Sequence, residues 1–123
     1  WADHYFKTIS NSKMGLNLSR GEPIKYYSSD RITQIIGNGL VTLIDERTGY
    51  RDFFSDNEMV FYKNINDLAE KITRISQDEK LRRKIGKKGR EKYLKYFNST
   101  LVADYIIKKT FDIKYNFKFA WEK

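Results

Sequence analysis

One segment, residues 28–45, restricts the fold of this chain more than any other part of the sequence. It begins with two serines and an aspartate at 28–30, which are residue types that favour the N-cap position just before the first residue of a helix. Isoleucines then recur at the i, i+3 and i+4 spacing of one helix face, as Ile32, Ile35 and Ile36. The pattern predicts a short helix with one apolar side.

Two glycines, Gly37 and Gly39, interrupt this pattern, and an almost wholly apolar run follows at 40–44. Such a run is typical of a parallel strand that is covered on both faces. Asp45 would then lie at the carboxyl end of the strand, where open α/β sheets bind their ligands. A dinucleotide-binding loop is excluded here, because that motif leads from a strand into a helix. We expect the glycines to allow tight packing and a left-handed helix end.

Helices and strands alternate along the whole chain. In chain order we expect a helix at 2–10, a strand at 14–19, a loop at 20–27 and the central helix and strand. A short helix or an aromatic plug at 50–54, a strand at 58–62, and helices at 64–77, 78–97 and 101–111 follow. This order predicts an α/β fold, a Rossmann-like three-layer parallel sheet with flanking helices and a helical C-terminal region. Residues 1–113 are expected to form one domain, and 114–123 are left unassigned as a basic aromatic tail.

The composition limits which cellular environments and which classes of partner are expected for this chain. With 123 residues the chain can build one domain with a core. Its 24 Lys and Arg against 16 Asp and Glu give a net charge of +8, which favours phosphate-bearing partners such as nucleotides, nucleic acid or an anionic membrane. The lack of cysteine excludes disulfides and thiolate chemistry and fits a cytoplasmic location. No apolar run has the length of a membrane span, and no metal-ligand cluster is apparent.

The loop at 20–27 leads from a strand end into a helix start, and this arrangement suits a phosphate. The first turn of a helix offers unpaired backbone N–H groups and a partial positive charge. The hydroxyls of Ser28 and Ser29 and the guanidinium of Arg31 would add donors. The alternative is an ordinary capped helix in which Arg31 is solvated or paired with a nearby aspartate.

An ordered series of motifs carries a family resemblance. The series is MGLNLSRG at 14–21, SDRITQIIGNGLVTLID at 29–45, FF at 53–54, EMVFY at 58–62, DLAEKI at 67–72 and GKKGRE at 86–91. It resembles the donor-binding domain of GT-B glycosyltransferases, of the "glycosyl transferases group 1" type that includes CgeB-like proteins. The resemblance covers residues 5–107, which is most of the chain.

The resemblance implies transfer of a sugar from a nucleotide-sugar to an unidentified acceptor. The nucleotide-sugar is the substrate, and no cofactor or metal is implied. The expected ligands of the diphosphate are Arg20, Ser28, Ser29 and Arg31, with Gln34 at the ribose and Asp45 lining the crevice. Gln34 stands where the family has a glutamate that holds the ribose, and Tyr26 stands where it has a second glutamate. The chain therefore departs from the two-glutamate pattern at both positions.

GT-B chemistry takes place between two domains, so the resemblance also implies a partner that this chain lacks. The acceptor site and any general base would lie on a missing N-terminal domain, and no catalytic residue is assigned here. The first strands of the donor domain are expected to be missing too, which would leave one sheet edge unpaired. Alone, the chain would be an inactive fragment of an enzyme.

The basic stretch at 80–95 leaves three interpretations open. A solvated helix face comes first, and a contact with the anionic inner face of the membrane comes second. Nucleic acid comes third, and a basic nucleic-acid-binding α/β module is the rival function for the whole chain. A purely structural domain is a further alternative, suggested by the loss of both family glutamates.

Overall fold

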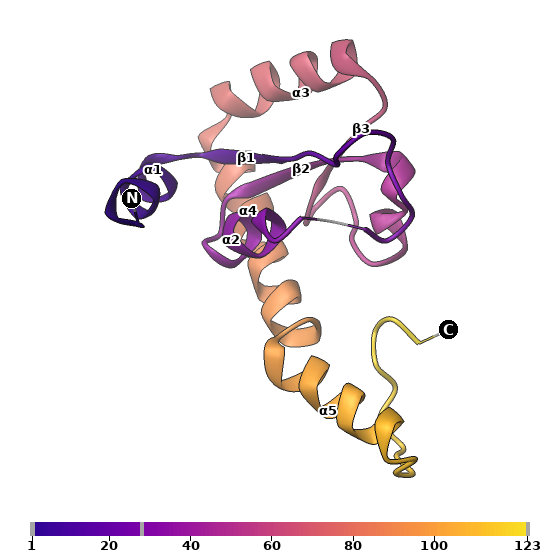
Figure 1. The fold of residues 1–123 in the computed structure, drawn as a ribbon. Coiled ribbons are helices and arrows are strands. Elements are labelled where there is room, and N and C mark those ends of the chain that lie inside the picture. Colours follow the sequence, from indigo (N-terminus) through magenta and orange to yellow (C-terminus); the bar gives the residue numbers. More distant parts are fainter. Residues whose placement is uncertain (1, 28, 123) are drawn as a thin grey trace.

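Three short parallel strands form the centre of the fold (Figure 1). The computed structural model describes residues 2–27 and 29–122. Strands β1 (Met14–Asn17), β2 (Val41–Asp45) and β3 (Val60–Tyr62) pair in the order β1-β2-β3. The central strand β2 is buried along its whole length, as its apolar run predicts. In the described part of the chain, β1 pairs with a strand on one side only.

The helices follow the predicted order, with bounds that shift by a few residues. They are α1 (Ala2–Asn11), α2 (Arg31–Gly37), α3 (Ile65–Gln77), α4 (Glu79–Tyr96) and α5 (Ser99–Thr110). Two single turns, η1 (Glu46–Thr48) and η2 (Tyr50–Asp52), lie between β2 and β3. The predicted α/β fold is therefore confirmed. None of the helices in these two described ranges combines the length and apolar character that crossing a membrane requires.

Two apolar clusters cover the two faces of the sheet. Because successive side chains of a strand point to opposite faces, Leu43 and Ile44 enter different clusters. Leu43 packs with Leu68 of α3 and Ile85 in the first half of α4. Ile44 packs with isoleucines of α2, and aromatic side chains from the second half of α4 lie against that cluster. The helix α4 thus contributes side chains to the clusters on both faces of the sheet. Between these two parts it packs against the backbone just before β2 and β3.

The start of α2 differs from the prediction. The residue before the helix is Asp30, and its side chain makes no capping hydrogen bond. The hydroxyl of Ser29 donates to Asn17 Oδ1 at 2.8 Å instead, so a tertiary partner at the end of β1 has replaced the local one. Asp30 therefore occupies the predicted N-cap position without a side-chain capping hydrogen bond, and Ser28 lies outside the described residues. By contrast, Asn64 caps α3 by accepting from the backbone N–H of Asp67.

The C-terminal tail folds back along α5 (Figure 1). It contains no helix or strand over 114–122, yet Phe119 is only 1% exposed. The Phe119 ring lies 5.0 Å from that of Tyr105 on α5 and 5.3 Å from that of Trp121. Ring packing therefore orders a segment that has no sequence period.

Candidate functional site

A surface cavity of about 410 Å³ lies just beyond the carboxyl end of β1. Its lining brings together the residue after the strand, the following loop and the start of α2, namely Leu18, Arg20, Tyr27, Ser29, Asp30 and Arg31. Arg20, Ser29 and Arg31 are three of the predicted diphosphate ligands. The fourth, Ser28, lies outside the described residues. The end of a parallel strand is where an open α/β sheet is expected to bind its ligand.

The two arginines give this cavity a positive wall. Both side chains are exposed, and neither forms an ion pair with a residue in the described ranges. Arg31 makes one long hydrogen bond, 3.4 Å from Nη2 to the carbonyl of Leu18. Asp30 lines the same cavity, so its carboxylate offsets one of the two positive charges. The remaining charge and the planar donor groups of the arginines suit a phosphate or carboxylate.

Asn17 holds Ser29 at the wall of the cavity. Asn17 is the last residue of β1 and is only 2% exposed. Its Oδ1 atom accepts a hydrogen bond from the Ser29 hydroxyl. Its Nδ2 group has no hydrogen-bond partner in the described part of the chain, which is a costly state for a buried amide. The sequence analysis missed this residue. The available signal was a polar residue at the carboxyl end of a short apolar strand.

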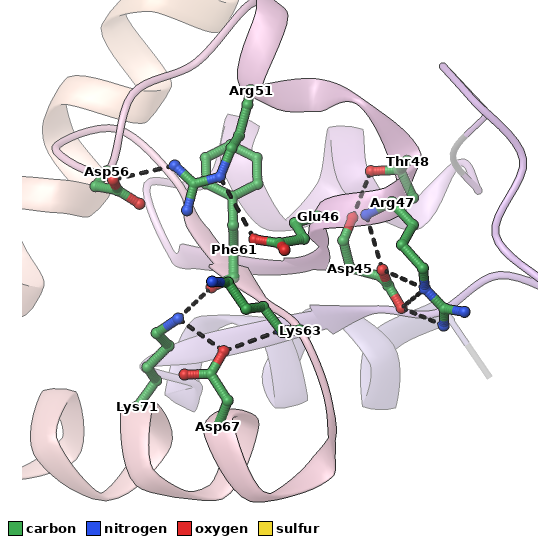
Figure 2. Close-up of polar contacts among 10 residues, drawn as sticks. All are labelled: Asp45, Glu46, Arg47, Thr48, Arg51, Asp56, Phe61, Lys63, Asp67 and Lys71. Atoms are coloured by element: carbon green, nitrogen blue, oxygen red, sulfur yellow. Dashed lines mark hydrogen bonds and ion pairs between the residues drawn. The ribbon is translucent and has the colours of Figure 1, made fainter.

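Asp45 lies at the carboxyl end of β2 as expected, but Arg47 occupies its carboxylate (Figure 2). Arg47 donates from Nη2 to Oδ2 at 2.8 Å and from its backbone N–H to Oδ1 at 2.9 Å. These hydrogen bonds lower the pKa of Asp45, although burial acts in the opposite direction. Arg47 also contacts Glu22 at 3.1 Å and so ties the loop after β1 to the end of β2. Asp45 is not among the residues that line the cavity.

A family comparison identifies the family of the chain. The family described as glycosyl transferase-like matches the chain over residues 1–108. The chain belongs to this family. No curated protein and no solved structure matches it. The matched range contains the whole cavity lining and ends before the aromatic tail.

In this glycosyltransferase-like domain, Gln34 and Tyr26, which depart from the two-glutamate pattern, are not among the residues that line the cavity. Gln34 is exposed on α2, its backbone carbonyl accepts from Asn38 at 2.7 Å, and its side chain does not line the cavity. Tyr26 has a left-handed backbone, with φ of 63°, and lines a second cavity. Gln34 follows Arg31 by one turn of α2 but is not among the residues that line the cavity.

Charged side chains attach the start of α3 to the end of β3 in the glycosyltransferase-like domain (Figure 2). Lys71 donates to the carbonyl of Phe61 and to Asp67, each at 2.8 Å. Asp67 also accepts from the backbone N–H of Lys63, and the Lys71 and Lys63 donors lower its pKa. Over residues 2–27 and 29–122, no three His, Cys, Asp or Glu side chains come together as a metal site requires.

Several basic side chains of α4 make hydrogen bonds or ion pairs within the glycosyltransferase-like domain. Arg90 donates to the carbonyl of Gly37 at 2.8 Å, Lys92 pairs with Glu58 at 2.9 Å, and Arg82 donates to a carbonyl at the end of α3. These contacts attach α4 to the chain before β2, to the chain before β3 and to α3. Fewer cations therefore remain for a membrane or a nucleic acid than the composition suggests.

Proposed function

We propose that this chain is the donor-binding part of a GT-B glycosyltransferase and that it holds the diphosphate of a nucleotide-sugar in the cavity beyond β1. The observation that carries the proposal is the grouping of Arg20, Ser29 and Arg31 around one cavity. The family match supplies the reaction class, because a glycosyltransferase must bind an activated sugar.

The arginines carry most of the proposed chemistry. Sugar transfer leaves negative charge on the departing diphosphate, and guanidinium groups already in place stabilise that charge without reorganising. Arg20 and Arg31 can each present two parallel N–H donors to phosphate oxygens. Ser29 already donates its hydroxyl to Asn17, so it serves a phosphate only by exchanging that hydrogen bond.

No general base is assigned to this chain, and the site that binds the acceptor is expected to lie on another domain. Positioning both reactants in one cleft supplies a large share of the rate of such a reaction. The chain alone should therefore bind a nucleoside diphosphate and transfer no sugar.

Heteronuclear NMR of the chain titrated with UDP, GDP and ADP tests this function, together with a transfer assay on their sugar conjugates. We expect shifts centred on residues 18–31 and no turnover. Shifts confined to α4, with a binding constant that falls steeply with salt, would indicate a polyanion surface instead. Sugar transfer by this chain alone would also contradict the proposal.

A further inference from the structure

One side of α4 carries a stripe of four lysines, which we call the lysine stripe. Its members are all exposed, namely Lys80, Lys84, Lys88 and Lys95. At the repeat of an α-helix, their positions fall within an arc of about 80°. Gly86 and Gly89 lie on the opposite side of the helix, against the backbone that leads into β2 and β3. The lysine stripe therefore faces away from the sheet.

No acidic side chain in the described part of the chain forms an ion pair with the lysine stripe. The carboxylates of α4 contact other cations of the same helix. Glu79 pairs with Arg83 at 2.7 Å, and Glu91, which lies within the arc of the stripe, contacts Lys87 at 3.8 Å. The stripe thus presents positive charge that the fold itself does not neutralise, and a surface of anionic groups would complement it.

Exposed apolar side chains lie at the C-terminal end of the lysine stripe. Leu94 is 44% exposed next to Lys95, and Phe117 of the tail, which folds back beside α5, is 50% exposed (Figure 1). Lys95 and Phe117 line one cavity of about 560 Å³ where α4 meets α5, together with Tyr96 and Leu101. The tail therefore adds an aromatic ring to the basic surface of α4.

We propose that the lysine stripe, Leu94 and Phe117 dock this chain on an anionic membrane surface. The lysines reach the negatively charged headgroups, while Leu94 and Phe117 enter the boundary between headgroups and acyl chains. Lysines on a helix face beside exposed Leu and Phe side chains are typical of proteins that lie on a membrane. A nucleic acid would use the lysines for its phosphates but would offer no apolar layer to Leu94.

This surface is separate from the diphosphate cavity. No residue of α4 lines the cavity beyond β1. The family match ends at residue 108, so it does not account for Phe117. Membrane docking therefore goes beyond the proposed function and can be tested apart from it.

Sedimentation of the chain with lipid vesicles tests the proposal. We expect binding to vesicles of phosphatidylcholine and phosphatidylglycerol in equal parts and none to phosphatidylcholine alone. Lys84→Gln combined with Lys88→Gln should weaken binding by roughly 25-fold, since each lysine near an anionic surface contributes about 5-fold. Lys7→Gln combined with Lys63→Gln is the matched control, because it removes the same charge from exposed positions outside α4.

The apolar contact is tested by Phe117→Ala. This change should weaken binding to the anionic vesicles by roughly 3- to 10-fold, because a half-exposed ring loses its place in the bilayer. Phe6→Ala is the control, since Phe6 is 64% exposed on α1 and should not contact the membrane.

Equal losses in the two double lysine variants would reduce the effect to net charge and overturn the proposal. Absence of binding to the anionic vesicles would also overturn it, as would tighter binding to a duplex RNA that Phe117→Ala leaves unchanged. The affinity for UDP should be the same in the Lys84→Gln and Lys88→Gln double variant as in the parent chain. The membrane proposal and the proposed function can therefore fail separately.

Discussion

A Cβ atom built on Gly86 of α4 would lie 2.1 Å from the carbonyl oxygen of Gly39. One turn later, a Cβ on Gly89 would lie 2.3 Å from the carbonyl oxygen of Glu58. These two close approaches let α4 lie directly on the backbone that leads into β2 and β3. The helix can therefore supply Ile85 to one face of the sheet and aromatic rings to the other.

Gly86→Ala should lower the free energy of unfolding by about 1–3 kcal/mol or more, because the added methyl group meets a backbone carbonyl. Urea denaturation followed by circular dichroism measures the change. Gly37→Ala is the control, since no atom outside its own helix backbone and its chain neighbours lies within 4 Å of its Cβ position. A helical glycine-to-alanine change gains up to about 1 kcal/mol. Equal stability of the two variants would show that α4 does not lie against Gly39.

Ile35→Ala should destabilise the domain by about 2–5 kcal/mol. Ile35 is 4% exposed and packs so closely on β1 that a Cβ on Gly15 would lie 2.5 Å from its side chain. Thermal melting measures the loss, and Ile65→Ala on α3 is the control because Ile65 is 73% exposed. An unchanged melting curve for Ile35→Ala would place the apolar face of α2 away from the sheet.

Arg31→Ala should weaken binding of a nucleoside diphosphate by about 1.5–3 kcal/mol, the usual loss for a hydrogen bond to a charged group. Its melting temperature should stay close to that of the parent chain, because Arg31 is exposed and makes one long internal hydrogen bond. Arg74→Ala, which removes an exposed arginine from α3, should change neither property. A sharp drop in melting temperature with full nucleotide affinity would make Arg31 a structural residue.

The stability of the domain should depend on pH through Asp45. The hydrogen bond from Arg47 holds the pKa of Asp45 below its ordinary value of 3.8, so folding favours the ionised form. This contribution is complete above the ordinary value and is lost as the pH falls through the lower folded value. The unfolding free energy should therefore decline on acidification below about pH 4.

Arg47→Gln tests this effect, although it also removes the exposed contact of Arg47 with Glu22. The variant should be less stable than the parent chain at pH 7, and the difference should shrink as Asp45 becomes protonated in both proteins. Other carboxylates with a lowered pKa, such as Asp67, remain in both chains and cancel in the comparison. Denaturation curves between pH 3 and 7 give the difference, and a gap that stays constant with pH would rule out this role for the pair.

Much of the fold could be predicted because it depends on neighbours in the sequence. The isoleucine spacing on α2 and the apolar run of β2 are short-range patterns, and the structure agrees with both. The grouping of residues around the cavity beyond β1 was partly predictable for the same reason. Arg31 and Ser29 lie at the start of one helix, and Arg20 lies in the loop that leads to it.

By itself, the sequence determined which segments become helices and strands and that β2 is covered on both faces. Only the tertiary structure decided where Ser29 and Asp45 find their partners, since hydrogen-bonding groups choose among all neighbours in space. It also decided that α4 packs against the backbone that leads into β2 and β3 and that Tyr26, Phe97 and Trp121 share one cavity. Those contacts join positions up to 95 residues apart. Local periodicity carries no information about contacts between such distant positions. The hydrophobic effect is non-directional, so it stabilises any apolar contact that the fold forms and does not specify which residues meet.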